Sequence, residues 1–424
     1  MRPFEYSSFG QKARTLSGIG ELMEDLGQAM SVRPDLLMLG GGNPAHIPEM
    51  EKVFRDAMED ILRTPGVYER CVGDYDGPGG NPAFLAAVAE LLKTQYGWPV
   101  GPDHIALTHG SQSAFYILFS LFAGRFSDGS FRKILLPLAP EYIGYADIGF
   151  APGQSLFTSV RPRMELLDHR QFKYHIDFDA LKIGPDIGAV CVSRPTNPTG
   201  NVLTDDEIAR LRTMTRAAGV PLIIDNAYGL PFPGILFEPA TLSWDEDVIL
   251  CMSLSKLGLP AVRTGIVVAR PDVIRAIRET TAVMSLAPGS IGPALALTLI
   301  QSRRIIELSQ NVIRPFYYRR MQTAVGLLRE SLDGMDYCIH KPEGAIFLWL
   351  WFKDLPVSSG ELYRRLKRRG VLVLSGHYFF PGLEHDDWSH KQQCIRMTYS
   401  QNESVVQRGI EILADEIKAI YAGA

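Results

Sequence analysis

The sequence has few cysteines and no pattern typical of a metal site. Its five cysteines, at positions 71, 191, 251, 338 and 394, include no CxxC pair, and its nine histidines form no HExxH motif. These spacings argue against a zinc site and against a disulfide framework. Scattered free thiols suit a reducing compartment, so we expect a cytoplasmic protein without a bound metal.

Long apolar runs and excess charge of one sign are also missing. The longest apolar runs, FYILFSLFAG at 115–124 and AIFLWLWF at 345–352, are shorter than the roughly 20 residues that span a bilayer. The opening stretch MRPFEYSSFGQKARTL lacks the apolar centre of a signal peptide. The formal net charge is only −4, which gives little attraction to nucleic acid or to an anionic membrane. We expect neither as a partner.

The middle of the chain alternates short apolar runs with amphipathic helical patterns. The runs are HIALTHG, KILLPLAP, GAVCVSRPTNPTG, PLIIDNAYG, DVILCMSLSK and GIVVA. Near-continuous apolar strands with helices between them predict a parallel sheet that is covered on both faces. One of the helices, at TDDEIARLRTMTRAAG, should begin after Thr204 as its N-cap.

The pattern of predicted helices and strands changes near residue 303. A long helical pattern is followed by the strand-like GAIFLWLWF, the helix-like GELYRRLKRRG, the strand-like CIRMTYS and a last helix. We therefore expect a large α/β domain over 49–303 and a smaller α+β domain over 304–424. Residues 1–48 are too few for a domain of their own and should pack with the smaller one.

Polar residues gather where the predicted strands end, which is where α/β sheets bind their ligands. The most unusual is Lys256, directly after an apolar run. A free lysine has a pKa near 10.4 and is a poor nucleophile, but burial and a nearby cation such as Arg263 lower that pKa, so that the amine can bond to a carbonyl carbon. Taken alone, this stretch fits a surface lysine in a loop equally well.

Several motifs, in order along the chain, resemble those of the class I and II aminotransferases. They are LGGGNPAHIP (39–48), YDGPGG (75–80), THGSQSA (108–114), RPTNPTG (194–200), DNAYG (225–229), SLSK (253–256) with Arg263, and CIRMTYS (394–400). The resemblance implies a fold-type I transferase that depends on pyridoxal 5′-phosphate (PLP). Such a protein has a large, mostly parallel seven-stranded sheet domain and a smaller α+β domain.

The resemblance also implies roles for single residues around the PLP ring. Lys256 would hold the aldehyde carbon and later move the substrate proton, Asp225 would pair with the ring nitrogen, and Asn197 and Tyr228 would bond the ring oxygen. Tyr142 would stack on the ring. The plainer alternatives are a helix N-cap for Asp225, turn chemistry for Asn197 and a core aromatic for Tyr142.

The remaining roles concern the phosphate, the substrate and a second subunit. A helix that begins at Ser111 would offer its N-terminus to the phosphate, with the other contacts from Gly110, Gln112, Ser253 and Arg263. The resemblance implies that Arg396 grips the substrate carboxylate with its planar fork, helped by Gly41 and Asn197. It also implies that Tyr75 reaches the cofactor of a neighbouring subunit, which predicts a homodimer with shared active sites.

The expected substrates are an amino acid and a 2-oxo acid. NPAHIPEM, LAPEYIGYAD, DNAYGLPFPGI, MSLSKLGLP, KPEGAIFLWLWFKDLP and GHYFFPGL are most similar to the branch of the family that passes the amino group of valine to pyruvate. No second arginine that could bind the side-chain carboxylate of a dicarboxylic substrate can be located, which favours a substrate with a neutral side chain. We expect Ile19, Tyr142 and the loop 376–382 to line the pocket for that side chain.

Three alternatives remain open from the residues. One is an aminotransferase of other aliphatic or aromatic amino acids. Another is a PLP-dependent lyase, since the cofactor stabilises the same carbanion in both reactions. The third is a ligand-sensing regulator, which would need a DNA-binding head. We expect the roughly forty residues before the glycine-proline segment to be too few for one.

Overall fold

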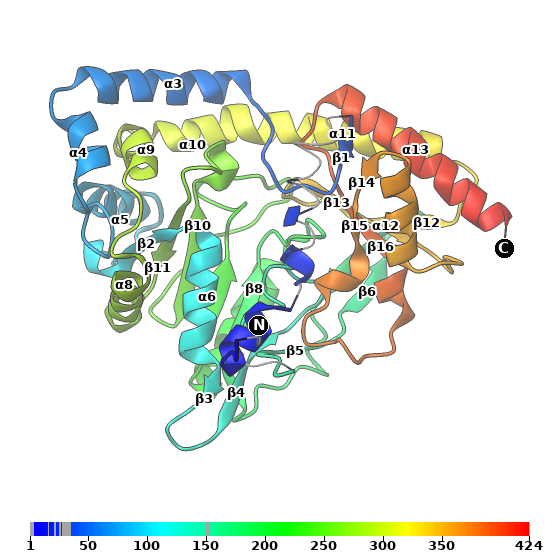
Figure 1. The fold of residues 1–424 in the computed structure, drawn as a ribbon, viewed down its shortest axis with the longest axis horizontal. Helices are drawn as coiled ribbons and strands as arrows, with labels where there is room; N and C mark the ends of the chain where they lie inside the picture. Colours follow the sequence, from blue (N-terminus) through cyan, green and yellow to red (C-terminus); the bar gives the residue numbers. More distant parts are fainter. Residues whose placement is uncertain are drawn as a thin grey trace.

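The computed structural model describes residues 4–15, 17–20, 23–24, 27, 35–149 and 153–423. Two sheets organise the described residues, with most helices packed around them (Figure 1). The large sheet has the strand order β2-β11-β10-β9-β8-β4-β3, and β5 pairs with β4. Its strands are β2 (Ile105–His109), β3 (Gly124–Arg125), β4 (Phe131–Leu136), β5 (Phe157–Ser159), β8 (Ile187–Ser193), β9 (Leu222–Asp225), β10 (Val248–Ser253) and β11 (Thr264–Val268).

This sheet is mostly parallel, as predicted, and has eight strands where the prediction had seven. The additional strand is the two-residue β3, which forms a short antiparallel hairpin with β4. β11 is antiparallel to both of its neighbours, β2 and β10. A parallel partner needs a crossover of a dozen or more residues, whereas only 254–263 separate β10 from β11, so the chain turns straight back.

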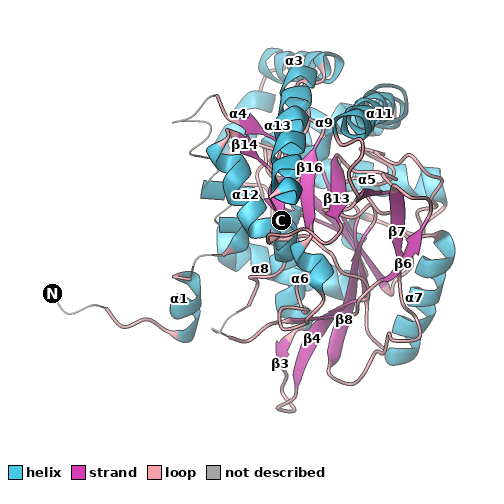
Figure 2. Cartoon of the chain, turned by 90° about the vertical axis from the view of Figure 1, so that its right-hand side faces the viewer, coloured by secondary structure: helices cyan, strands magenta, loops and turns pink. Residues whose placement is uncertain are grey.

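Successive strand residues feed two separate cores, one on each face of the large sheet. In β9, Leu222 and Ile224 belong to one buried cluster and Ile223 belongs to the other. This follows from the period of two in strand side chains, and it explains why the strands read as continuous apolar runs. Figure 2 shows α7 (Asp205–Ala218) on one side of the sheet and α6 (Ser111–Phe122) on the other.

The start of α7 confirms the predicted cap. The Thr204 hydroxyl accepts from the Glu207 N–H at 3.1 Å, and the Glu207 carboxylate accepts from the Thr204 N–H at 2.8 Å. This reciprocal pair satisfies two amides that the helix itself cannot. The helix ends at Gly219, whose φ of 68° is readily adopted by glycine.

The second sheet has the order β15-β16-β13-β12-β7-β6. Four of its strands come from the C-terminal part of the chain, but β6 and β7 lie in the range expected for the large domain. A separate pair joins β1 to β14 in parallel. The bounds are β1 (Leu37–Met38), β6 (Arg163–Leu166), β7 (Gln171–His175), β12 (Tyr337–His340), β13 (Phe347–Phe352), β14 (Val371–Leu372), β15 (Leu374–Ser375) and β16 (Cys394–Thr398).

The other helices pack around the two sheets. In Figure 1 the long α11 and α13 run along one edge of the molecule beside the second sheet. Their bounds are α1 (Ser8–Ala13), α3 (Pro48–Arg63), α4 (Val67–Gly73), α5 (Pro82–Tyr96), α8 (Pro271–Ser285), α9 (Ile291–Gln301), α10 (Arg304–Leu308), α11 (Arg314–Ser331), α12 (Ser359–Arg368) and α13 (Glu403–Ala422).

Candidate active site

A cavity of about 580 Å³ opens where the strands of the large sheet end and the second sheet begins. Parallel strands bring their carboxyl ends to one edge, so residues far apart in the sequence meet there. The predicted residues that line the cavity are Gly41, Ser111, Gln112, Tyr142, Asn197, Asp225, Tyr228, Ser253, Lys256, Arg263 and Arg396.

One side of the cavity is built to hold an anion. Gly110 precedes α6 with a φ of 80°, and a Cβ at this position would lie 2.1 Å from Nη2 of Arg263. Glycine therefore lets the guanidinium lie directly over the start of the helix. The free N–H groups of Ser111 and Gln112 and the helix dipole add positive potential at the same point. We call this arrangement of Gly110, the start of α6 and Arg263 the anion cup, and a phosphate group suits it.

Lys256 lies at the cavity wall just beyond β10. Its Nζ donates a hydrogen bond to the Gly42 carbonyl at 2.6 Å and lies 5.3 Å from the centre of the Tyr228 ring. Burial, followed by the charge of Arg396, lowers the pKa of Lys256 from 10.5 to about 8; Asp225 opposes this shift and Arg263 adds to it. A fraction of this amine is therefore uncharged near neutral pH, as nucleophilic chemistry requires.

Asp225 ends β9 as a buried carboxylate, which excludes the alternative of a helix N-cap. Its Oδ2 accepts from the Tyr145 hydroxyl at 2.8 Å and its Oδ1 accepts from the Ala227 N–H at 3.0 Å. Burial raises the pKa of Asp225, while the hydrogen bond from Tyr145 acts against the rise. Such a carboxylate is ready to pair with a cationic N–H group from a ligand.

Two neighbours of Asp225 were not assigned from the sequence. Tyr145 is fully buried and stands three residues after Tyr142, where nothing in the spacing marks it. Glu141 accepts from the N–H and the hydroxyl of Ser193, at 2.8 and 2.6 Å. Burial is the main cause that raises the pKa of Glu141 to about 8, and the charge of Asp225 contributes.

Tyr142 projects into the cavity from the turn after Glu141. A Cβ on Gly144 would lie 2.4 Å from Cε1 of Tyr142, so only glycine leaves room for the ring there. Gln112 donates to the Gly144 carbonyl at 2.8 Å, and its buried Oε1 has no hydrogen-bond partner among the described residues. These contacts fix the position of the ring beside the anion cup.

Arg396 enters the cavity from β16 and is 2% exposed. Its Nη1 donates to Oδ1 of Asn197 and its Nη2 to the Gly40 carbonyl, both at 2.6 Å, and its guanidinium lies 4.0 Å from the centre of the Phe347 ring. Burial lowers the pKa of Arg396 to about 10. No carboxylate among the described residues pairs with it, so its remaining donors suit the carboxylate of a ligand.

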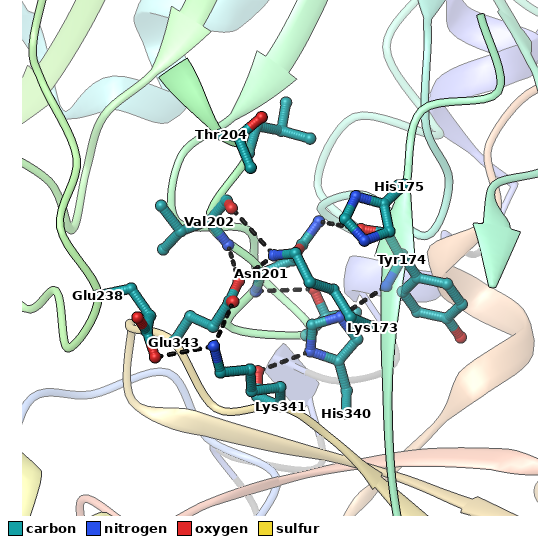
Figure 3. A network of polar contacts seen from close by, with 12 residues as sticks. Lys173, Tyr174, His175, Asn201, Val202, Thr204, Glu238, His340, Lys341 and Glu343 are labelled. Carbon is teal, nitrogen blue, oxygen red and sulfur yellow. Dashed lines mark hydrogen bonds and ion pairs between the residues drawn. The ribbon is translucent and has the colours of Figure 1, made fainter. Parts of the chain in front are cut away.

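A buried polar network includes Asn201 and Val202, which follow Asn197 along the chain (Figure 3). Lys173 forms an ion pair with Glu343 and donates to Oδ1 of Asn201 at 2.8 Å. Glu343 also accepts from the Val202 N–H at 2.9 Å. The network ties β7 and the segment before β13 to Asn201 and Val202. Sequence patterns gave no sign of it, because a buried lysine and its carboxylate lie 170 positions apart.

Tyr75 does not line the cavity and is 83% exposed. Other exposed apolar side chains occur on α4 and at the end of α8, including Val72, Val283 and Leu286. The Ser290 hydroxyl donates to Asp76 at 2.7 Å, which joins the Tyr75 segment to the residues after α8. This surface therefore combines an exposed tyrosine with large apolar groups.

Within the described part of the chain, no cluster of three or more His, Cys, Asp or Glu residues could hold a metal ion. No helix among the described residues is both long and apolar enough to span a membrane.

The fold and the cavity together define a class of protein. The chain belongs to the class I and II aminotransferases, because the model of that family, "Aminotransferase class I and II", matches residues 48–413. A match of this length includes both the large sheet and most of the C-terminal part.

Individual relatives are similar over nearly the full length. The chain is 51% identical over 417 residues to the valine–pyruvate aminotransferase of Escherichia coli K12, covering 98% of this chain and 99% of that one. The crystal structure of the valine-pyruvate aminotransferase of Salmonella typhimurium LT2 has a TM-score of 0.88 at 50% identity, covering 96% and 100% of the chains. A putative amino-acid aminotransferase of Psychrobacter arcticum has a TM-score of 0.96 at 44% identity, covering both chains fully.

Proposed function

We propose that this protein is a PLP-dependent aminotransferase that moves the amino group of L-valine to pyruvate. The products would be 3-methyl-2-oxobutanoate and L-alanine. The substrate assignment rests on the 51% identity to the Escherichia coli valine–pyruvate aminotransferase. The reaction type rests on one observation, the meeting of Lys256, Asp225 and Arg396 in a single cavity.

The residues present fit PLP, which carries a phosphate, an aldehyde, a ring nitrogen and a ring oxygen. The cup at Gly110 and Arg263 matches the phosphate, because glycine alone leaves the guanidinium its place there. Lys256 matches the aldehyde and Asp225 the ring nitrogen, while Asn197 and Tyr228 line the same cavity as candidates for the ring oxygen. Ser111, Gln112 and Ser253 supply further donors to the phosphate, and Tyr142 supplies an aromatic face.

When bound, PLP draws electrons from the substrate α-carbon and so stabilises the negative charge that forms there as the α-proton leaves. Lys256 would be the base that takes this proton. With a pKa near 8 its amine can accept and return a proton close to neutral pH. The hydrogen bond to the Gly42 carbonyl keeps Nζ at the cavity wall.

Arg396 binds the carboxylate that both substrates share. Two of its donors are held by Asn197 and Gly40, so the plane of the guanidinium is fixed before the substrate arrives, and less entropy is lost on binding. Among the described residues that line the cavity, Arg263 is the other arginine, and it faces the anion cup. The rest of the lining includes Ile19, Met38 and Ile143, which favours a neutral aliphatic side chain.

The protein is proposed to work as a homodimer in the cytoplasm. Tyr75, exposed in the single chain, would complete the active site of the partner, and the apolar side chains beside it would be covered in the dimer. Five free cysteines fit a reducing compartment. Mixing inactive Lys256→Ala protein with Tyr75→Phe protein tests the sharing of sites, because hybrid dimers would contain one site with neither substitution.

A spectroscopic titration of the purified, PLP-loaded protein tests the reaction. Valine alone should convert the bound cofactor to pyridoxamine phosphate, and pyruvate should restore the original spectrum with release of alanine. Valine, 2-aminobutyrate and alanine should be accepted with graded efficiency, because a hydrophobic pocket separates them by only about 1–3 kcal/mol per methylene. Ammonia release without a 2-oxo acid would instead indicate a lyase.

A further inference from the structure

A second cavity, of about 280 Å³, lies next to the active-site cavity. It is formed between the turn after Tyr142 and the loop before β16, and Gly18 contributes from the N-terminal segment. Ile143 is the described residue that lines both cavities. Its side chain is 1% exposed and lies between the two spaces.

The wall between the cavities is thin. A Cβ on Gly18 would lie 3.6 Å from Cδ1 of Ile143 and 2.9 Å from Cδ1 of Tyr378. The outer methyl of Ile143 therefore points toward the residues of the second cavity. The Glu141 N–H donates to the Phe379 carbonyl at 2.8 Å, which holds the turn that carries Ile143 against the loop at 376–380.

The second cavity has an apolar part, while the exposed Asp147, Glu384 and Gln392 line its open side. Ala146, Phe380, Pro381 and Leu383 contribute apolar surface. Its lysine, Lys391, donates to the carbonyls of Leu383 and Asp386 at 2.6 and 2.5 Å. The charge of Lys391 is therefore already stabilised by the backbone and does not need an acidic ligand.

We propose that Ile143 sets the maximum length of the substrate side chain, because it separates the substrate pocket from the apolar part of the second cavity. The inference rests on the proposed function, because it assumes that the side chain of an amino acid occupies the first cavity. Shortening Ile143 joins the two spaces, and unbranched apolar side chains longer than that of valine then gain a place to lie.

The test compares variants at two positions of the second cavity. Ile143→Ala opens the wall, and Ile143→Val removes only Cδ1, a milder change that keeps the protein folded if the alanine variant does not fold. Ile143→Ala with Ala146→Leu opens the wall but refills the space behind it. Ile148→Ala is the matched control, since Ile148 is also buried but lines neither cavity.

The readout is kcat/KM for norleucine and 2-aminoheptanoate, each divided by the value for valine. In Ile143→Ala this ratio should rise about fourfold for each methylene that enters the second cavity, so about 15-fold for two. Ile143→Val should show a smaller rise, the refilled double variant should lose the gain, and Ile148→Ala should show none. An unchanged ratio in folded Ile143→Ala, or an equal gain in the refilled variant, would overturn the proposal.

Binding of unreactive straight-chain carboxylic acids gives an independent readout. Butanoate to octanoate should bind Arg396 through the carboxylate, and calorimetry then measures affinity against chain length. In the wild type the affinity should stop rising at a short chain, whereas in Ile143→Ala it should continue to rise. Failure of wild-type turnover with valine would reject the proposed function alone, since the chain-length series still reports on Ile143. Identical series in both proteins would reject the role of Ile143.

Discussion

The substitution Arg396→Lys tests the carboxylate site and its magnitude can be worked from the contacts. A guanidinium has five N–H donors, of which one bonds Asn197 and another bonds Gly40. Three donors remain for a substrate carboxylate, enough for a two-point grip. An ammonium group has three donors in all, so after bonding the same two oxygens it keeps a single one for the substrate.

The variant should therefore lose one charge-assisted hydrogen bond to the substrate. Such a bond contributes about 1.5–3 kcal/mol, which corresponds to a rise in KM for valine of about 10- to 150-fold. The contact exists both before and during proton transfer, so kcat should change far less than KM. Binding of PLP should be unaffected, since the anion cup lies at Gly110 and Arg263.

Steady-state kinetics with valine and pyruvate measure both constants, and the absorbance of bound cofactor reports its retention. Arg408→Lys, on the exposed face of α13, is the control for the exchange of arginine for lysine. A KM for valine within threefold of the wild type would refute the assignment of Arg396. A loss of PLP from the variant would refute the separation of the two anion sites.

Three other predictions follow from buried charges. Asp225→Asn should slow the valine-driven spectral change about 100-fold or more with PLP still bound; a slowing below fivefold would contradict the role given to its charge. In the cofactor-free protein, Lys256→Met should raise the free energy of unfolding at pH 7 by about 3 kcal/mol, because the pKa of Lys256 falls from 10.5 to about 8 on folding. The unfolded chain holds that proton more tightly, so wild-type stability in urea titrations should approach that of the variant as pH rises from about 8 to 10.5. A difference in unfolding free energy that stays constant over this range would contradict the lowered pKa of Lys256. Glu343→Gln strands the buried charge of Lys173 and should cost about 3–5 kcal/mol, whereas Glu238→Gln, in a half-exposed pair, should cost less than about 1 kcal/mol; equal losses in chemical denaturation would argue against the network.

Much of the large sheet could be predicted because its strands are buried on both faces. β8, β9 and β10 are runs of apolar residues that end in polar ones, and this pattern both marks a parallel strand and locates the ligand edge. The antiparallel direction of β11 follows from the short connection between β10 and β11, and the apolar pattern of the strand itself does not indicate it. The pairing of β6 and β7 with the second sheet is a long-range contact, and local periodicity does not encode it.

Some residues of the site could be predicted from the sequence and others could not. Residues that ended strands or stood in family motifs, such as Asp225, Lys256 and Arg396, could be placed in one cavity before the structure was known. Tyr145 could not, because its hydrogen bond to Asp225 spans 80 positions. Backbone acceptors such as the Gly42 carbonyl cannot be predicted from a sequence either, since any residue supplies a carbonyl.

The proposed function depends on the amine of Lys256 as the group that carries the cofactor. Reduction of the PLP-loaded protein with borohydride, followed by digestion and peptide mass spectrometry, tests it directly. Lys256 should carry a phosphopyridoxyl group, and a Lys256→Ala variant should stay folded but neither show this adduct nor exchange amino groups. An unmodified Lys256 peptide, or turnover of valine by the alanine variant, would contradict it.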